Sequence, residues 1–266
     1  MAAGTSVQIM GILNVTPDSF SDGGRFTNKE AIRRQVEEML AAGVDIIDVG
    51  GESTRPFASP VDVQMELDRV IPAIEVIRAI SDVPVSIDTT KADVAQAALA
   101  AGANMINDIS ALRMDANMVA VAREYDGPVI IMHMQGTPAT MQLDPRYDDV
   151  VEEILAFFRE RISWLEEQGV SRDRIIVDPG IGFGKTVEDN LIILRNVARF
   201  RKTGCPVLVG HSRKSFLGSL FDLDVHRRDC PTAMISMFLV QQGVTILRIH
   251  DVESSRWAVK LAGILS

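Results

Sequence analysis

Cysteine is scarce in this sequence of 266 residues. Its two cysteines, Cys205 and Cys230, cannot form a disulfide framework, and they are not spaced as the Cys-x-x-Cys pair of zinc and redox motifs. Reduced thiols are typical of the cytosol, so we expect a cytoplasmic protein. No basic residue precedes Arg25 and no long apolar run lies there, so the features of a signal peptide are missing.

Aromatic residues and positive charge are also scarce. The sequence has 10 Phe, 2 Tyr and 2 Trp, and 27 Lys and Arg stand against 36 Asp and Glu, for a net charge of −9. Binding nucleic acid without sequence preference requires basic surface for phosphate and aromatic side chains for base stacking. No run approaches the roughly 18 apolar residues of a membrane span. We therefore expect neither a nucleic-acid nor a membrane partner, although an acidic protein can still bind a small anion in a positive cleft.

What the sequence does contain is an alternation of short apolar runs and amphipathic stretches. The predicted strands are residues 8–15, 45–50, 84–88, 105–109, 129–134, 175–178, 207–210 and 246–250, and the predicted helices are roughly 28–42, 61–80, 91–101, 115–125, 146–168, 187–200, 229–242 and 252–265. Gly43, Gly102, Gly169 and Gly243 each follow a predicted helix, as helix-ending glycines do. This alternation predicts an α/β protein with a parallel sheet.

Eight strand–helix units favour a single (β/α)8 TIM barrel over an open doubly wound sheet. No proline- or serine-rich linker and no change of composition divides the chain, so we expect one domain over residues 1–266. Catalytic groups of such barrels stand at the carboxyl ends of the strands. Polar residues do follow the predicted strands, among them Asn14, Arg55, Asp88, Asn107, His133, Asp178, Lys214, Arg248 and His250. For any one of them, a helix cap is the alternative explanation; for eight strand ends together, an enzyme is the better one.

Two familiar motifs are disfavoured. The segment GIGFGKT at residues 180–186 lacks the first glycine of a phosphate-binding P-loop, because that position is Pro179. A tight glycine turn with close access to its backbone explains this segment better. A zinc site made of His133, His211 and His250 is disfavoured by the wide spacing of the three residues.

Two carboxylates at strand ends suggest a nitrogen heterocycle as the ligand. Asp88 and Asp178 can each accept hydrogen bonds from an exocyclic amine and a ring N–H, and Asn107 can bind further along such a ring. Capping of the next helix is the alternative for the two aspartates, and it is more plausible for Asp88 than for Asp178. A set of four cationic side chains suits an anionic substrate or leaving group, with surface ion pairing as the alternative. The four are Arg55, Lys214, Arg248 and His250.

Eight segments of the sequence resemble the dihydropteroate synthase family. The segments are GILNVTPDSFSDGG (residues 11–24), GGESTRP (50–56), SIDT (86–89), NDI (107–109), MHMQGTP (132–138), DPGIGFGK (178–185), GHSRKS (210–215) and RIHDV (248–252). They occur in the family's order, and the resemblance covers residues 8 to 262. It implies a TIM-barrel transferase, usually a homodimer, that joins 4-aminobenzoate to 6-hydroxymethyl-7,8-dihydropterin diphosphate with Mg2+ bound to the diphosphate.

The resemblance also implies roles for individual residues. Asp88, Asn107, Asp178 and Lys214 would hold the pterin; Asn14 would contact the metal; Arg55, Arg248 and His250 would surround the diphosphate. Thr54, Arg55, Pro56 and Phe20 would belong to loops that order around the substrates, while Lys214 and Ser215 would line the aminobenzoate site with Phe183 nearby. Asp88, Asp178, Lys214 and Arg248 are the expected catalytic residues.

Two departures from the family pattern stand out. Phe57 replaces a glycine of the usual Arg-Pro-Gly-Ala, which predicts either a solvent-facing ring or a ring that narrows the aminobenzoate site. Residues 229–232, Asp-Cys-Pro-Thr, replace a glycine-containing turn at an expected dimer or helix boundary, and we expect that change to leave the chemistry alone. Two rivals are a pterin-dependent methyltransferase barrel and a non-catalytic pterin-binding subunit. The loops at residues 54–56 and 212–215 argue against the first, and the four cationic residues argue against the second.

Overall fold

Eight parallel strands form the centre of the molecule. The computed structural model describes residues 7–16, 25–53 and 60–265. The strands are β1 (Gln8–Asn14), β2 (Ile46–Gly50), β3 (Val85–Asp88), β4 (Met105–Asp108), β5 (Val129–Met132), β6 (Ile175–Asp178), β7 (Leu208–Val209) and β8 (Ile246–Ile249). Their order in the sheet is β6-β5-β4-β3-β2-β1-β8-β7. A parallel bridge between Val177 and Val207, with Val177 N donating to Pro206 O at 3.0 Å, joins β6 to the start of β7. The sheet thus closes on itself, and the TIM barrel is confirmed.

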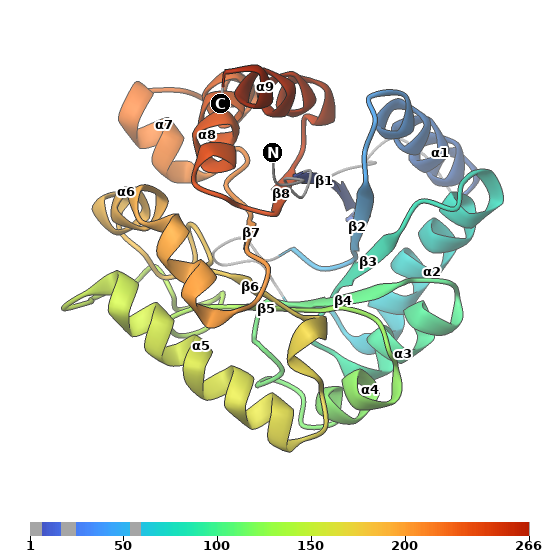
Figure 1. Ribbon diagram of the computed structural model, residues 1–266. Helices are drawn as coiled ribbons and strands as arrows, with labels where there is room; N and C mark the ends of the chain where they lie inside the picture. The colour runs from blue at the N-terminus through green and yellow to red at the C-terminus, as the bar shows by residue number, and fades with distance from the viewer. Residues whose placement is uncertain (1–6, 17–24, 54–59, 266) are drawn as a thin grey trace.

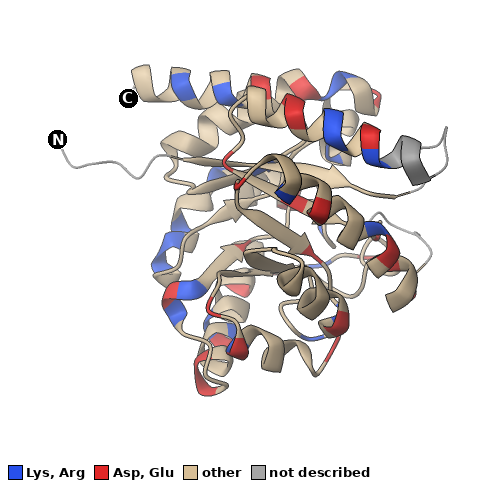
Figure 2. Cartoon of the chain, turned by 90° about the vertical axis from the view of Figure 1, so that its right-hand side faces the viewer, with Lys and Arg blue, Asp and Glu red and all other residues tan. Residues whose placement is uncertain are grey.

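The helices surround this barrel on the outside (Figure 1). They are α1 (Arg25–Ala41), α2 (Val63–Ile80), α3 (Ala92–Ala100), α4 (Met118–Glu124), α5 (Val150–Glu167), α6 (Val187–Arg195), α7 (Ser215–Phe221), α8 (Asp229–Gln241) and α9 (Val252–Ile264). The four predicted helix-ending glycines have φ values from +79° to +111°, the left-handed conformation that glycine adopts without a steric penalty. Basic and acidic residues are interspersed along the outer helices (Figure 2), and no described helix is long and apolar enough to cross a membrane.

The helix predictions differ most from the structure at three places: one helix was not predicted, and two others have different boundaries. Helix α7, only seven residues long, was not predicted, because a short segment interrupted by Gly218 has little helical periodicity. Helix α5 begins at Val150 rather than at residue 146, because Asp149 caps it by accepting hydrogen bonds from Val151 N and Glu152 N at 3.0 Å. Helix α6 ends at Arg195 and is followed by a 3-10 helix over Val197–Thr203.

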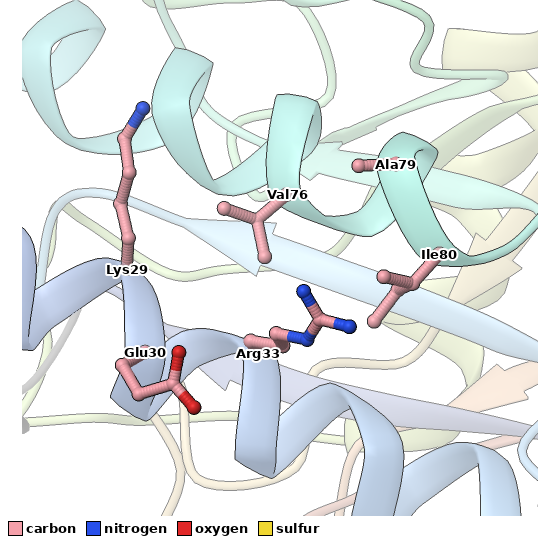
Figure 3. A pocket seen from close by; sticks show the side chains of 6 residues that line it. All are labelled: Lys29, Glu30, Arg33, Val76, Ala79 and Ile80. Carbon is pink, nitrogen blue, oxygen red and sulfur yellow. The ribbon is translucent and has the colours of Figure 1, made fainter.

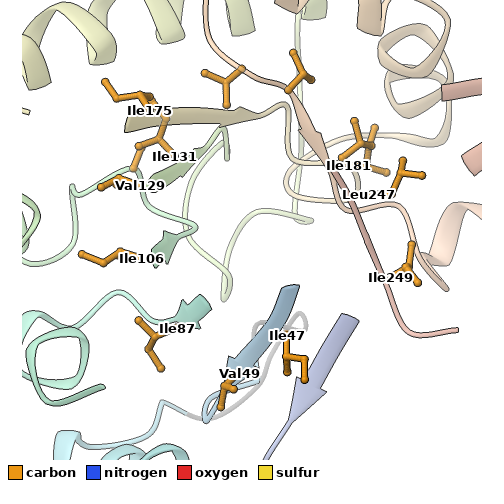
Figure 4. Close-up of a cluster of buried hydrophobic side chains, with 14 of the residues drawn as sticks. Ile47, Val49, Ile87, Ile106, Val129, Ile131, Ile175, Ile181, Leu247 and Ile249 are labelled. Atoms are coloured by element: carbon orange, nitrogen blue, oxygen red, sulfur yellow. The ribbon is translucent and has the colours of Figure 1, made fainter. Parts of the chain in front are cut away.

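Two apolar layers hold the barrel and the helices together. The outer layer lies between strands and helices, where side chains such as Ile47, Val49, Ile87 and Ile249 are buried (Figure 4). A separate cluster comes from the opposite face of the strands, and its members are Met10, Ile46, Met105, Ile130, Ile176, Leu208 and Ile246. Because successive side chains of a strand point to opposite faces, this second cluster fills the barrel interior.

Candidate active site

Polar side chains stand directly above the apolar cluster of the barrel interior. Asp48, Asn107, Asp178 and Arg248 each follow a member of that cluster by two positions, on β2, β4, β6 and β8. The period-two alternation of a strand therefore places all four on the inner face, one layer nearer to the carboxyl ends. The sequence pattern and the barrel closure together bring residues from four strands into one mouth.

Arg248 is the centre of a buried ion-pair network. Its Nε donates to Asp48 Oδ2 and its Nη2 to Asp88 Oδ2, each at 2.6 Å. Burial opposes the charge of Arg248, but Asp48 and Asp88 together raise its pKa above the ordinary value. Burial also raises the pKa of Asp88 to about 7, although Arg248 lowers it. Asp88 therefore binds Arg248 and does not cap the helix that follows, so the capping alternative is wrong for this residue.

Asp48 was missed by the sequence reasoning. Its side chain is fully buried, and both of its oxygens lie 3.3 Å from Asn107 Nδ2, in addition to the contact with Arg248. Asp48 thus orients two predicted site residues at once. The available signal was a single acidic residue inside the apolar run Ile46–Gly50, since a charged group is seldom buried without a partner.

A second ion-pair group lies at the base of the β2–α2 segment. Lys91 Nζ lies 2.5 Å from both Glu52 Oε2 and Glu66 Oε2, and the Glu66 side chain is fully buried. Glu52 Oε1 also accepts a hydrogen bond from Val61 N at 3.1 Å. On this side of the mouth, as around Arg248, the partly buried cations are directly paired with carboxylates.

Asp178 occupies the opposite side of the mouth. Its Oδ1 accepts a hydrogen bond from Gly180 N at 2.8 Å, whereas its Oδ2 accepts none from the described residues. Burial raises the pKa of Asp178, and the bond from Gly180 and the charges of Lys214 and Arg248 oppose that rise. Oδ2 also borders Gly210, where an added Cβ would lie 3.6 Å from it. Asp178 thus retains an oxygen that can accept from a ligand.

Lys214 lies over an aromatic ring and forms no ion pair with a carboxylate of the described residues. Its Nζ is 4.0 Å from the centroid of Phe183, a cation–π contact. Burial lowers the pKa of Lys214 to about 8, with Arg248 lowering it further and Asp178 raising it. Phe183 belongs to a small apolar cluster on this side of the mouth. Its other members are Ile109, Met132, Met134 and Met141.

The glycine-rich segment after β6 forms the tight turn that the sequence predicted. Gly180, Gly182 and Gly184 have φ values of +72°, +81° and +63°. The backbone that comes close is that of the β5–α5 segment: a Cβ on Gly180 would lie 2.0 Å from His133 O, and one on Gly184 2.7 Å from Gln135 O. The glycines thus let two neighbouring loops pack backbone against backbone.

The remaining predicted residues lie around this mouth or outside the described residues. Ser212 positions His250: its Oγ accepts a hydrogen bond from His250 N at 3.0 Å and lies 2.9 Å from His250 Nδ1. Ser215 is exposed and begins α7. His211 is fully buried, and burial lowers its pKa to about 4. Thr54, Arg55, Pro56, Phe57 and Phe20 lie outside the described residues.

The unusual segment at residues 229–232 is tied to the loop that carries Lys214. Arg213 Nε and Nη2 donate to the two carboxylate oxygens of Asp229 at 2.6 and 2.8 Å, and Arg213 N donates to Thr232 Oγ1 at 3.2 Å. Arg213 has a φ of 55°, a left-handed conformation that costs energy for a residue with a side chain. The segment therefore holds the backbone next to Lys214, a connection that the sequence did not indicate.

Oxygen ligands suited to Mg2+ are present beside Gly50. A Cβ placed on Gly50 would lie 3.6 Å from Asn14 Oδ1 and 3.7 Å from Asp88 Oδ2, so both oxygens border the same glycine. Within the described residues, no group of three or more His, Cys, Asp or Glu side chains is arranged to hold a metal ion. Mg2+ commonly needs only one or two protein oxygens when substrate phosphates complete its shell. Because Asp88 Oδ2 already accepts from Arg248 Nη2, Asn14 Oδ1 is the oxygen of this pair that fits a metal held mainly by a diphosphate.

A separate hollow lies on the helical shell, between α1 and α2. It has a volume of about 240 Å³ and is lined by Lys29, Glu30, Arg33, Val76, Ala79 and Ile80 (Figure 3). It shares no residue with the barrel mouth and has no buried ionisable group in its lining. The mouth of the barrel remains the candidate active site.

Known proteins resemble this chain along nearly its whole length. The model of the pterin binding enzyme family matches residues 10–250. A dihydropteroate synthase of Synechocystis is 44% identical over 263 residues, which cover 98% of this chain and 91% of that protein. The crystal structure of a Clostridium difficile dihydropteroate synthase, determined in the presence of pteroic acid, is 42% identical and covers 100% of this chain and 98% of its own, with a TM-score of 0.93. A Xanthomonas albilineans dihydropteroate synthase with 4-aminobenzoic acid is 42% identical, covers 97% of this chain and 93% of its own, and has a TM-score of 0.91.

Proposed function

The chain belongs to the dihydropteroate synthase family of pterin-binding enzymes, and we propose the roles that its own side chains play in that family's reaction. The enzyme is a transferase that condenses 4-aminobenzoate with (7,8-dihydropterin-6-yl)methyl diphosphate to give 7,8-dihydropteroate and diphosphate. In this step the amine nitrogen bonds to the pterin methylene carbon. The bond from that carbon to the diphosphate oxygen breaks, its electron pair leaves with the diphosphate, and the amine loses a proton.

Asp178 and Asn107 bind the pterin ring in this proposal. Asp178 keeps Oδ2 available as an acceptor on the inner face of the barrel, which is the observation that carries the proposal. An aminopyrimidine ring offers N–H donors that a carboxylate can accept in pairs. Asp48 fixes the amide of Asn107 so that it can bind the ring edge. Lys214 completes this set from the segment between β7 and α7.

Arg55, Arg248 and His250 surround the diphosphate in this proposal, and Arg248 is oriented by its ion pairs with Asp48 and Asp88. The aromatic amine is neutral, so the difficult event is cleavage of the carbon–oxygen bond, which leaves positive charge on the pterin and negative charge on the diphosphate. Buried Asp88 and Asp178 favour the first charge and the cationic side chains favour the second. This arrangement supports a path of dissociative character. Mg2+, held by Asn14 together with the diphosphate, would supply further stabilisation of the leaving group.

Ser215 and Phe183 line the aminobenzoate end of the mouth, and Thr54, outside the described residues, would belong to a loop that orders around the substrates. Phe183 lies beneath the Lys214 ammonium, so an aromatic acid can meet an apolar ring and a positive charge at the same place. In this proposal Asp88, Asp178, Lys214 and Arg248 are the catalytic residues, and residues 1–266 form a single pterin-binding barrel domain in the cytoplasm.

A coupled assay of diphosphate release tests the proposed reaction, and ligand binding by a His250 variant tests the assignment of the diphosphate site. Release should require both 4-aminobenzoate and the pterin diphosphate. His250→Ala should weaken binding of the pterin diphosphate much more than binding of the free hydroxymethyl pterin, because only the former carries the charge that His250 meets. Calorimetric affinities reduced equally for both ligands would give His250 a structural role instead.

The exposed apolar surface of α8 and α9 supports a homodimer. Met234 and Phe238 lie one turn apart on α8, and their side chains are 67% and 40% exposed. Trp257 and Leu261 lie one turn apart on α9 and are 60% and 47% exposed. Apolar patches of this kind mark association surfaces. Light scattering should therefore give about twice the chain mass of 29.1 kDa.

Phe238→Asp is the corresponding interface variant. It should yield a monomer, because a charge would be buried without a partner at the interface. The matched control is Leu143→Asp, at an exposed apolar residue of the β5–α5 segment that is not part of this surface. A native monomer, or a dimer that survives Phe238→Asp, would contradict the proposed interface.

A further inference from the structure

Lys185 is a buried cation that the reaction described above does not use. It is 3% exposed, and its Nζ lies 3.1 Å from His133 Nδ1, 3.3 Å from His133 O and 2.9 Å from Phe183 O. Within the described residues it forms no ion pair with a carboxylate. An ammonium group has three hydrogens to donate, and Lys185 has three acceptors.

His133 is in the form that this contact needs. Burial lowers the pKa of His133 to about 2, and the charges of Lys185 and Arg113 lower it further. The imidazole is therefore neutral, and its Nδ1 can present a lone pair to Lys185 while Nε2 carries the hydrogen. The ring is held from its other sides by Phe157, in an edge contact with centroids 5.0 Å apart, and by Tyr147 at 6.1 Å.

The acceptors of Lys185 come from two different loops. His133 follows β5, whereas Phe183 lies in the glycine turn after β6. These are the loops that approach closely at Gly180 and Gly184, and Tyr147 Oη adds a bond to Gly184 O at 2.7 Å. Lys185 thus joins the β5 and β6 loops by hydrogen bonds from one buried nitrogen, and one of these bonds ends on the carbonyl of Phe183.

The side chain of Phe183 connects the hydrogen bonds of Lys185 with the mouth of the barrel. Its ring packs on the apolar cluster with Met134 and supports the Lys214 ammonium at 4.0 Å. We propose that Lys185 is a positioning residue that holds the Phe183 ring in the place that receives 4-aminobenzoate. This inference rests on the proposed aminobenzoate role of Phe183, and the experiment separates the two.

The test is a double-mutant cycle with Lys185→Met and Phe183→Ala. Methionine keeps an unbranched apolar stem and removes the donor. Lys185→Met should raise the KM for 4-aminobenzoate by about tenfold or more, while the Kd of the pterin diphosphate changes by less than about threefold. Because Lys185 acts through Phe183, adding Lys185→Met to Phe183→Ala should raise that KM little further. Lys202→Met, at an exposed lysine of the 3-10 helix, is the matched control and should change neither constant.

Each other outcome has a defined meaning. A Phe183→Ala variant with an unchanged KM would remove Phe183 from the aminobenzoate site, which is a failure of the proposed function. A normal response to Phe183→Ala combined with independent, multiplicative effects of the two changes would overturn the role of Lys185 alone. Equal losses of aminobenzoate and pterin binding in Lys185→Met would also overturn it, because they would show general damage to the barrel.

A measurement on the unaltered enzyme keeps the inference testable if Lys185→Met does not fold. Histidine 15N resonances distinguish a protonated Nδ1 from an unprotonated one. Below the pKa of Lys185, which burial lowers to about 7, the ammonium can only donate, so the contact requires His133 Nδ1 to be unprotonated there. A protonated Nδ1 at His133 would contradict the contact and with it the positioning role.

Discussion

Arg248 and Lys214 stand in the same barrel mouth but in opposite electrostatic surroundings. On the side formed by β2, β3, β4 and β8, Arg248 is bonded to two carboxylates, and nearby Lys91 is bonded to two more. On the side formed by β5, β6 and β7, Lys185 is buried against carbonyls and an imidazole, and the partly buried Lys214 lies over an aromatic ring. We call these the paired side and the unpaired side.

The difference appears in the protonation of the cations. Carboxylates raise the pKa of Arg248, whereas burial lowers the pKa of Lys214 to about 8 and that of Lys185 to about 7. A paired cation is partly neutralised by its carboxylates, so Arg248 also holds the site together. An unpaired buried cation gains stability when an anion binds, so the unpaired side is better suited to respond to an anionic substrate.

Arg248→Ala has the largest expected effect and tests whether the paired cation stabilises the fold more than the unpaired one does. It should destabilise the protein by about 3–5 kcal/mol, because it leaves Asp48 and Asp88 buried without their counter-charge. Lys214→Ala removes a cation without orphaning an ion-pair partner and should cost clearly less. Denaturant unfolding of both variants at pH 7 measures the two free energies. Equal costs would mean that the two sides do not differ in the way described.

Asp178→Asn has the next largest expected effect. The amide places an NH2 donor where the pterin needs an acceptor, and loss of a charge-assisted bond of about 1.5–3 kcal/mol corresponds to roughly 10- to 150-fold weaker binding. Calorimetry with the free hydroxymethyl pterin measures this loss. Unchanged affinity would remove Asp178 from the pterin site.

The pH dependence of substrate binding tests whether the unpaired cation Lys214 must be charged to bind the substrate. In the free enzyme Lys214, with its pKa lowered to about 8 among Arg248, Asp178 and Asp88, loses its charge as the pH rises above that value. If binding requires the charged form, the Kd of the pterin diphosphate should increase by about tenfold per pH unit above that point. Lys214→Arg keeps its charge and should remove most of this increase. An identical pH profile in the two enzymes would assign the titration to another group.

The sign for stability is the reverse of that for binding. Between about pH 8 and the ordinary lysine value of 10.5, the unfolded chain keeps a proton at Lys214 that the folded protein has lost. The unfolded state then binds more protons, so this group makes the folded state more stable as the pH rises through that window. Unfolding free energies of the native protein, compared with those of Lys214→Arg over the same window, should diverge in this direction.

Phe57→Gly has the smallest expected effect and concerns a loop residue outside the described residues. If the ring narrows the aminobenzoate site, the glycine variant should lower the inhibition constant of a substituted sulfonamide a few-fold, because such inhibitors extend past the aminobenzoate carboxylate position. The KM for 4-aminobenzoate should change little. If both constants move by one factor, or neither moves, Phe57 faces solvent and does not select between ligands.

The inner face of the mouth was largely predictable from the sequence. Asp88, Asn107, Asp178 and Arg248 were recognised because each lies at the last or next-to-last position of its strand, and the structure places all four on the inner face. Asp48 lies two residues before the end of β2 and was missed because other polar residues, among them Arg55, follow that strand. Lys185 was missed because its residue type, next to a glycine-rich segment, also suited an ordinary exposed turn.

Local patterns thus determined the eight strands, the (β/α)8 architecture, the glycines that end the helices and the family to which the chain is similar. Each of these depends on residues within a few positions of one another, where backbone geometry acts directly. Tertiary structure alone decided which charges meet: Arg248 bonds to Asp48 and Asp88, 200 and 160 residues away, and Lys185 to His133, 52 residues away. Closing the barrel buries these groups together, and burial then sets whether each cation is paired or left to attract a ligand.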